Sequence, residues 1–145
     1  MCHLTTETKL TRKTVYKICH KVNGNYFGMF AGMLIEKGPV LDEDCWRDKR
    51  PDDMHYSSYN TWDYLFNVLA VGRCSGFSSK RSIKAYFYSE SKYYNKHFGV
   101  TLAVLKMTLG GSIVKGDARG IADMISDSSL IYAGTEIIDF EEIKI

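Results

Sequence analysis

An alternating segment that ends in a tight-turn dipeptide constrains the fold of this chain more than any other feature. Residues 14–22 alternate in character with a period of two, which predicts a half-buried strand. Asn23-Gly24 follows at once and tolerates the positive φ angles of a two-residue hairpin turn. Residues 25–30 predict the returning strand, which Gly28 and Gly32 weaken. The chain is therefore expected to begin with an antiparallel hairpin.

Three later segments carry helical signals. The first follows a cap at Asn60 or Thr61, and its apolar stripe consists of Trp62, Leu65, Phe66 and Leu69. The second follows a cap at Ser78 or Ser79, and its buried face is expected to hold Ile83, Tyr86, Phe87 and Tyr88. Its solvent side is expected to hold Lys80, Arg81 and Lys84. A short third helix after Asp117 is expected to bury Ile121, Met124 and Ile125.

The second half of the chain also predicts strands. Residues 100–109 form the most strand-like segment, and Gly110-Gly111 predicts a turn into a strand over 112–115. Residues 129–145 predict two short strands around Ala133-Gly134. Together with the helices, these segments predict an α+β fold, with a mostly antiparallel sheet, an N-terminal hairpin and two to three helices packed on it.

One compact domain over residues 1–145 is expected, because the chain shows no internal repeat, linker or shift in composition. Residues 42–60 lack periodicity and predict a long surface excursion. There is no run of about 18 apolar residues and no apolar leader, so we expect no membrane span and a cytoplasmic protein.

The formal net charge of +2 conceals blocks of opposite sign. Residues 1–41 carry six basic and two acidic side chains, and residues 64–116 carry eight basic and one acidic. Residues 42–63 carry three basic and seven acidic side chains, and residues 117–145 carry two and seven. The blocks either pair in the fold or present a charged face to a partner. An acidic interaction surface would be formed by Asp42, Glu43, Asp44, Asp52 and Asp53.

Cysteine and histidine chemistry is the first candidate for a site. The pairs Cys2-His3 and Cys19-His20 are adjacent, and adjacent strand residues point to opposite faces, so we expect no metal ion and no cofactor. The four cysteines are expected to be reduced and mostly buried. Cys74 beside Arg73 is a candidate nucleophile, with His97 or His55 as its base.

Phosphate binding is favoured over nucleophilic chemistry. Residues 72–81 are rich in Gly and Ser, are basic and open a helix, which is typical of anion-binding loops, although an ordinary capped loop has the same composition. The spacing of a Walker motif is missing. Aromatic residues then alternate with lysines, and the rings of Tyr93 and Tyr94, which we expect to be exposed, could stack on bases. The candidate ligand-binding residues are Arg73, Ser78, Ser79, Lys80, Arg81, Tyr93 and Tyr94.

Three stretches resemble a group of small uncharacterised proteins of phages and prophages. The first is Met1-Cys2-His3-Leu4-Thr5 followed by Val15-Tyr16-Lys17. The second is Gly76-Phe77-Ser78-Ser79 before a helix with Ala85 and Tyr86, where the group has a His that this chain lacks. The third runs from Leu105-Lys106-Met107 through residues 112–116 and Ser126-Asp127 to Glu141-Glu142-Ile143. The layout also resembles a reduced ADP-ribosyltransferase-like fold, whose catalytic residues do not map onto this sequence.

The resemblance implies a context. It implies a phage-encoded, non-enzymatic inhibitor of a bacterial defence system, acting in the cytoplasm of the host cell. Such a protein would bind either a nucleotide second messenger or a defence effector protein of the CRISPR type, and a homodimer is compatible with its size. The alternative is a small ADP-ribosyltransferase-like enzyme that acts on nucleotides or nucleic acid.

Overall fold

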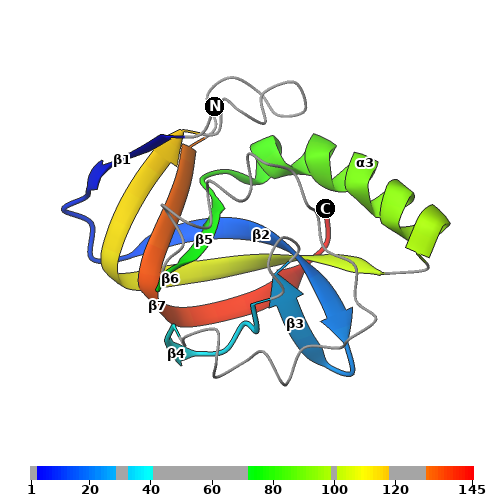
Figure 1. Cartoon of the computed structure of the whole chain (residues 1–145), viewed down its shortest axis with the longest axis horizontal. Coiled ribbons are helices and arrows are strands. Elements are labelled where there is room, and N and C mark those ends of the chain that lie inside the picture. Colours follow the sequence, from blue (N-terminus) through cyan, green and yellow to red (C-terminus); the bar gives the residue numbers. More distant parts are fainter. Residues whose placement is uncertain (1–2, 29–32, 41–71, 99–100, 118–129) are drawn as a thin grey trace.

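The computed structural model describes residues 3–28, 33–40, 72–98, 101–117 and 130–145. These residues form one sheet and one helix (Figure 1). The elements are β1 (His3–Glu7), β2 (Lys13–Val22), β3 (Asn25–Gly28), β4 (Gly38–Pro39), β5 (Cys74–Phe77), α3 (Lys80–Phe98), β6 (Leu102–Asp117) and β7 (Leu130–Ile143).

The N-terminal hairpin is confirmed. Strands β2 and β3 pair in antiparallel fashion, and the last pair before the turn is Val22 opposite Asn25. Asn23 and Gly24 adopt φ angles of 51° and 81°, the left-handed conformation that a two-residue hairpin turn requires at both positions. After β3 the chain turns back along it, because Leu34 forms a bridge with Phe27.

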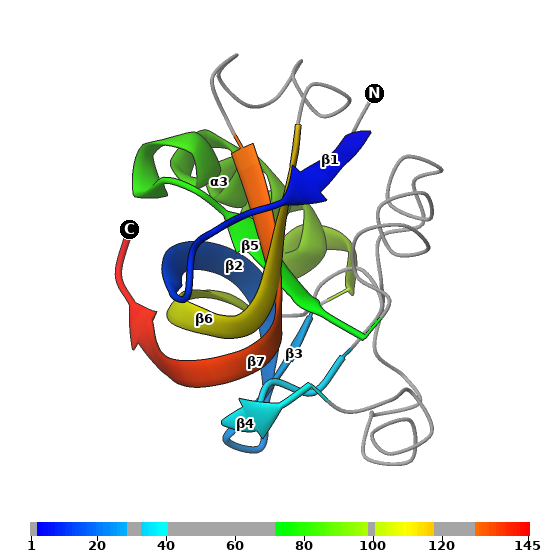
Figure 2. The same cartoon turned by 90° about the vertical axis from the view of Figure 1, so that its left-hand side faces the viewer.

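Strands β6 and β7 are the longest elements, with 16 and 14 residues, and they pair along almost their whole length. The other edge of β6 pairs with β2 over residues 102–109 and with β1 over residues 114–117. Strand β7 pairs in turn with β5, and β5 returns to β2 through Phe77 opposite Tyr16. The circuit β2–β6–β7–β5 therefore closes on itself, and Figure 2 shows these strands curling around one another.

A β-bulge bends β6 where the sequence predicted a turn. Between Gly110 and Ile113 the register advances by three residues on β6 and by two on β7, so one extra residue is accommodated on β6. Gly111 takes a φ of 71°, which a residue with a side chain rarely adopts. The Ser112 amide donates a hydrogen bond to Thr135 Oγ1 at 2.9 Å. The two glycines thus bend one strand rather than joining two.

The two faces of β2 are buried by different partners. Val15 and Cys19 belong to the main core cluster. Their partners in this cluster come from β5, β6, β7 and the segment before β4, and the buried members are Ile35, Cys74, Leu105, Met107, Leu109, Ile113, Tyr132 and Ile137. His20 lies on the opposite face, because successive strand side chains alternate, and its ring meets Tyr94 of α3. Figures 1 and 2 show α3 on one side of the sheet, away from β3 and β4.

The expected α+β architecture with two to three helices packed on a sheet is wrong. The described part of the chain is mostly antiparallel sheet and contains a single helix. The sequence predicts a turn at residues 72–77, but these residues contain β5. The short, glycine-containing segment does not by itself favour an extended backbone; it is extended because its backbone groups form hydrogen bonds with β7 and β2. Residues 129–145 contain one long strand, since Ala133 and Gly134 pair with both β5 and β6.

Other expectations fall on residues outside the described ranges. These are the excursion at 42–60, the acidic surface there, the helix after Asn60 and Thr61, and the short helix after Asp117. In the part of the chain that the structure describes, α3 is too polar to cross a membrane.

Gly134→Ala should destabilise the fold because β5, β6 and β7 meet at this position. An added Cβ would lie 2.8 Å from the carbonyl oxygen of Gly110 and 3.0 Å from Leu109 Cβ, and the backbone cannot rotate away as a side chain can. We expect the free energy of unfolding to fall by about 2–3 kcal/mol in urea titrations. Gly24→Ala is the control: open space surrounds its new methyl group, and its positive φ should cost about 1 kcal/mol. An equal or smaller loss for Gly134→Ala would contradict the packing described.

Candidate functional site

The acidic C-terminal strand is paired with basic residues of the N-terminal block. Lys21 Nζ lies 3.0 Å from Glu142 Oε1, and Lys37 Nζ lies 3.1 Å from Asp139 Oδ1. The hydrogen bond from Lys21, followed by that from Tyr26, lowers the pKa of Glu142. The hydrogen bond from Lys37 and the Phe140 amide lower the pKa of Asp139. Exposed pairs of this kind add little stability, but they offset two of the four carboxylates of β7.

Helix α3 carries mostly charge of the opposite sign. Its exposed cations are Lys80, Arg81, Lys84, Lys92 and Lys96. At about 100° per residue, four of these five fall within about one third of the helix circumference, namely Arg81, Lys84, Lys92 and Lys96. They lie away from the stripe of Ile83, Phe87 and Tyr94, of which Ile83 and Tyr94 are buried and Phe87 is half-buried; we call it the buried stripe. Among the side chains that the structure describes, no carboxylate forms an ion pair with Lys80, Arg81, Lys84 or Lys96. We name this surface the basic face of α3, defined by these five cations.

Two adjacent tyrosines of α3 have different environments. Tyr93 is 52% exposed, and its ring lies 4.5 Å from the His97 ring at an interplanar angle of 43°. Tyr94 is only 4% exposed, and its ring meets the His20 ring edge-on at 5.7 Å. The expectation that both rings are exposed is correct for Tyr93 and wrong for Tyr94, because Tyr94 follows Ile83 and Phe87 on the buried stripe. Phe87 and Tyr94 follow Ile83 by four and eleven residues, and this helical spacing already indicates that Tyr94 lies on the same side of the helix as Ile83.

Arg73 faces strand β6 rather than the start of α3. Its Nε donates to the Ser112 carbonyl oxygen at 3.4 Å, and its Nη2 donates to Ser112 Oγ at 3.2 Å. Ser112 in turn contacts Thr135, the residue before Glu136. Arg73 therefore belongs to a chain of hydrogen bonds, through Ser112 to Thr135, at the bulge of β6. The residue types alone do not predict this contact, because it joins segments far apart in the sequence.

The remaining predicted ligand residues separate into two groups. Ser78, Ser79, Lys80 and Arg81 surround the start of α3, which begins at Lys80 directly after the predicted capping serines. Tyr93 lies twelve residues beyond Arg81, or about 18 Å along the helix axis. One small ligand cannot touch both groups. The cations close to Tyr93 in the helix are Lys92 and Lys96. Neither is among the predicted ligand residues, although their spacing of four residues places them on one side of the helix.

A buried lysine and two buried cysteines lie inside the sheet circuit. Lys17 is 7% exposed, and its ammonium group donates to the Ser75 carbonyl oxygen at 3.0 Å. Its side chain passes close to Gly28, where a Cβ would approach Lys17 Cε to 3.3 Å. Burial raises the pKa of Cys19 to about 12 and also raises the pKa of Cys74. At neutral pH these thiols are protonated and enclosed, which opposes the nucleophile interpretation of Cys74.

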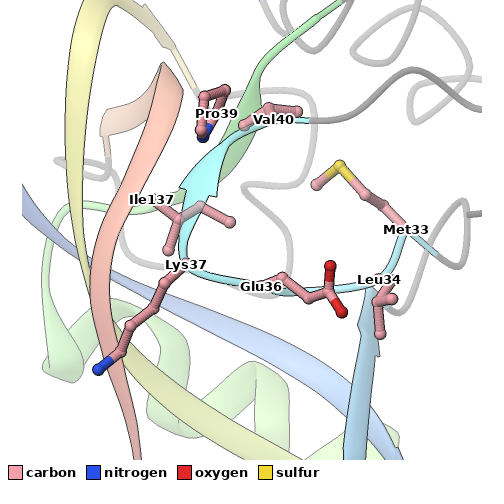
Figure 3. Close-up of a pocket in the computed structure, with 7 residues that line it drawn as sticks. All are labelled: Met33, Leu34, Glu36, Lys37, Pro39, Val40 and Ile137. Carbon is pink, nitrogen blue, oxygen red and sulfur yellow. The ribbon is translucent and has the colours of Figure 1, made fainter. Parts of the chain in front are cut away.

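A shallow pocket of about 110 Å³ lies between β7 and the segment that contains β4 (Figure 3). Its lining consists of Met33, Leu34, Glu36, Lys37, Pro39, Val40 and Ile137. Figure 3 shows the Lys37 amine directed away from the pocket, consistent with its ion pair to Asp139. The volume is below the roughly 300–1,000 Å³ of most small-molecule sites, and few polar groups converge on it.

Among the described residues, no three His, Cys, Asp or Glu side chains gather where they could hold a metal ion. Comparison with known proteins finds no matching family model, no matching curated protein and no matching solved structure. The basic face of α3 is therefore the candidate site, on the evidence of its charge and exposure.

The two tyrosines provide a matched pair of variants. Tyr94→Ala should lower the free energy of unfolding by about 3 kcal/mol, because it removes a buried ring that anchors α3 to β2. Tyr93→Ala should cost less than about 1 kcal/mol, because half of that ring is already in water. Thermal or urea unfolding of both variants measures the difference. Similar losses would show that α3 is not seated as described.

The buried thiols should be unreactive in the folded protein. In a variant with Cys2→Ser and Cys45→Ser, only Cys19 and Cys74 remain. We expect an aromatic disulfide that reacts with thiols to modify neither cysteine at pH 8 until urea unfolds the chain. Both cysteines are buried, and their raised pKa values leave little thiolate. Modification of the native variant at the rate of a small free thiol would contradict their enclosure.

Proposed function

We propose that this protein is a non-enzymatic binding protein that holds a phosphate-bearing ligand on the basic face of α3. The observation that carries the proposal is the segregation of charge. Five exposed cations share one helix, whereas Asp139 and Glu142 of the acidic strand are paired with lysines of other elements. The sequence left both a basic and an acidic interaction surface open, and among the described residues the pairing of Asp139 and Glu142 favours the basic one.

Clustering makes these cations effective together. A single exposed ion pair is worth at most about 1 kcal/mol. Several like charges on one surface instead add their fields, attract an anion over a distance and release its counterions on binding. A ligand with several phosphates gains from each contact, whereas a ligand with one carboxylate gains from only one or two.

The biological setting of the proposal comes from the sequence resemblance to phage and prophage proteins. In that setting the ligand is a nucleotide signal, or nucleic acid, used by a bacterial defence system, and binding it inhibits that system inside the host cell. Capture of a CRISPR-type effector protein through the acidic residues at 42–53 stays a prediction, because those residues lie outside the described ranges.

The alternative is a small ADP-ribosyltransferase-like enzyme. The polar chain of Arg73, Ser112 and Thr135 favours it to a limited extent, because it ends beside the carboxylate residue Glu136. The two functions predict different fates for the ligand. A binding protein returns it intact after heat denaturation, whereas an enzyme returns it altered.

A charge reversal on α3 tests the proposal. The purified protein would be titrated with cyclic oligonucleotides, ADP-ribose isomers, transfer RNA and plasmid DNA. We expect Lys84→Glu/Lys96→Glu to weaken binding at least tenfold, because it replaces two attractive charges by repulsive ones. Lys9→Glu/Arg12→Glu changes the net charge equally at exposed positions outside α3 and is the matched control.

The outcomes separate the possibilities. Loss of binding in the α3 variant alone, with ligand recovered unchanged, supports the proposal. Equal binding by both variants, or no binding to any phosphate-bearing probe, contradicts it. An altered ligand whose alteration is abolished by Glu136→Gln supports the enzyme instead.

A further inference from the structure

The basic face of α3 is long. From Lys80 to Lys96 it spans sixteen residues, which is about 24 Å along the helix axis. A mononucleotide or a small cyclic nucleotide concentrates its phosphates at one place and would contact only one end. A polymer with regularly spaced phosphates can contact cations along the whole face.

An exposed aromatic ring stands beside the C-terminal part of this face. Tyr93 is next to Lys92 in the chain and one helical turn from Lys96 and His97. The Tyr93 ring packs against His97 on one side and against the edge of Tyr94 on another, at 4.5 and 5.9 Å between ring centroids. These contacts restrict a ring that still exposes half of its surface, so it is already ordered for stacking.

We infer that the basic face of α3 binds single-stranded nucleic acid, with the lysines along the phosphate backbone and Tyr93 stacked on one base. The inference rests on the proposed function and names its ligand. A single strand is favoured over a duplex because stacking on a side chain requires a base whose face is uncovered. Lysines act as point charges that contact backbone phosphates, so the binding is expected to be largely independent of sequence.

The test uses a fluorescein-labelled 12-mer of thymidine and a 12-base-pair duplex, titrated by fluorescence anisotropy at several KCl concentrations. We expect the single strand to bind more tightly than the duplex. Tyr93→Ala should weaken binding of the single strand about 5- to 150-fold, the range for loss of one stacked base, and should leave the salt dependence unchanged. Tyr93→Phe should bind like the unmodified protein, because it keeps the ring.

The charge variants report a different quantity. Lys84→Glu/Lys96→Glu should reduce the slope of log affinity against log salt by about 1.4, since each lost phosphate contact on a single strand removes about 0.7. Leu10→Ala, which truncates an exposed apolar side chain on the β1–β2 connection, should change neither the affinity nor the slope.

Tighter binding to the duplex, or an unchanged affinity in Tyr93→Ala, would overturn the inference. If cyclic nucleotides bind through α3 and the single strand does not, the inference fails and the proposed function stands. If no phosphate-bearing probe binds, both fail.

Discussion

Strand β6 is hydrogen-bonded on both edges, and the rest of the structure depends on this double pairing. One edge serves β2 and then β1, while the other serves β7 along nearly its full length. A strand of 16 residues can do this only by bending, and the bulge at Gly110 and Gly111 supplies the bend. Because β6 bends, β7 can also pair with β5, and β5 pairs with β2, which closes the circuit. Residues 102–105 of β6 are buried on both faces, one face inside this circuit and the other on the side of the sheet where α3 lies.

Closure also determines where a functional surface can lie. The inner face of β2 is filled by core residues and by the stem of Lys17, whose ammonium group is satisfied by Ser75. The outer face is covered by the buried stripe of α3, through Tyr94 on His20. The side of α3 that faces away from the sheet remains in solvent, and it carries the cations. A buried thiol or lysine inside the circuit is shielded from solvent, whereas the cations of α3 are exposed.

The sequence predicted the parts of this arrangement that local rules control. The hairpin at Asn23 and Gly24, the helix after Ser79 and the exposure of Lys80, Arg81 and Lys84 follow from turn chemistry, capping and helical period. The bulge was missed because Gly110-Gly111 permits a turn and a bulge equally, and only pairing with a distant β7 decides between them. Strand β5 was missed for the same reason: Gly76 matters because Val15 packs against it, and no local pattern shows that contact. In the candidate site, Tyr94 was misplaced although the helical period already assigned it to the buried stripe.

The net charge of +2 is therefore compatible with a polyanionic ligand. Net charge describes the field far from a protein, whereas a bound ligand experiences the charges within about one Debye length, roughly 8 Å at physiological salt. Helix α3 contains four lysines, one arginine and one carboxylate, Glu90, whereas at β7 Lys21 and Lys37 offset Glu142 and Asp139. A ligand that follows α3 along its length therefore meets a local field more positive than the total suggests, because the helix carries five cations and one carboxylate. The same geometry predicts strong screening by salt, because every one of these cations is exposed.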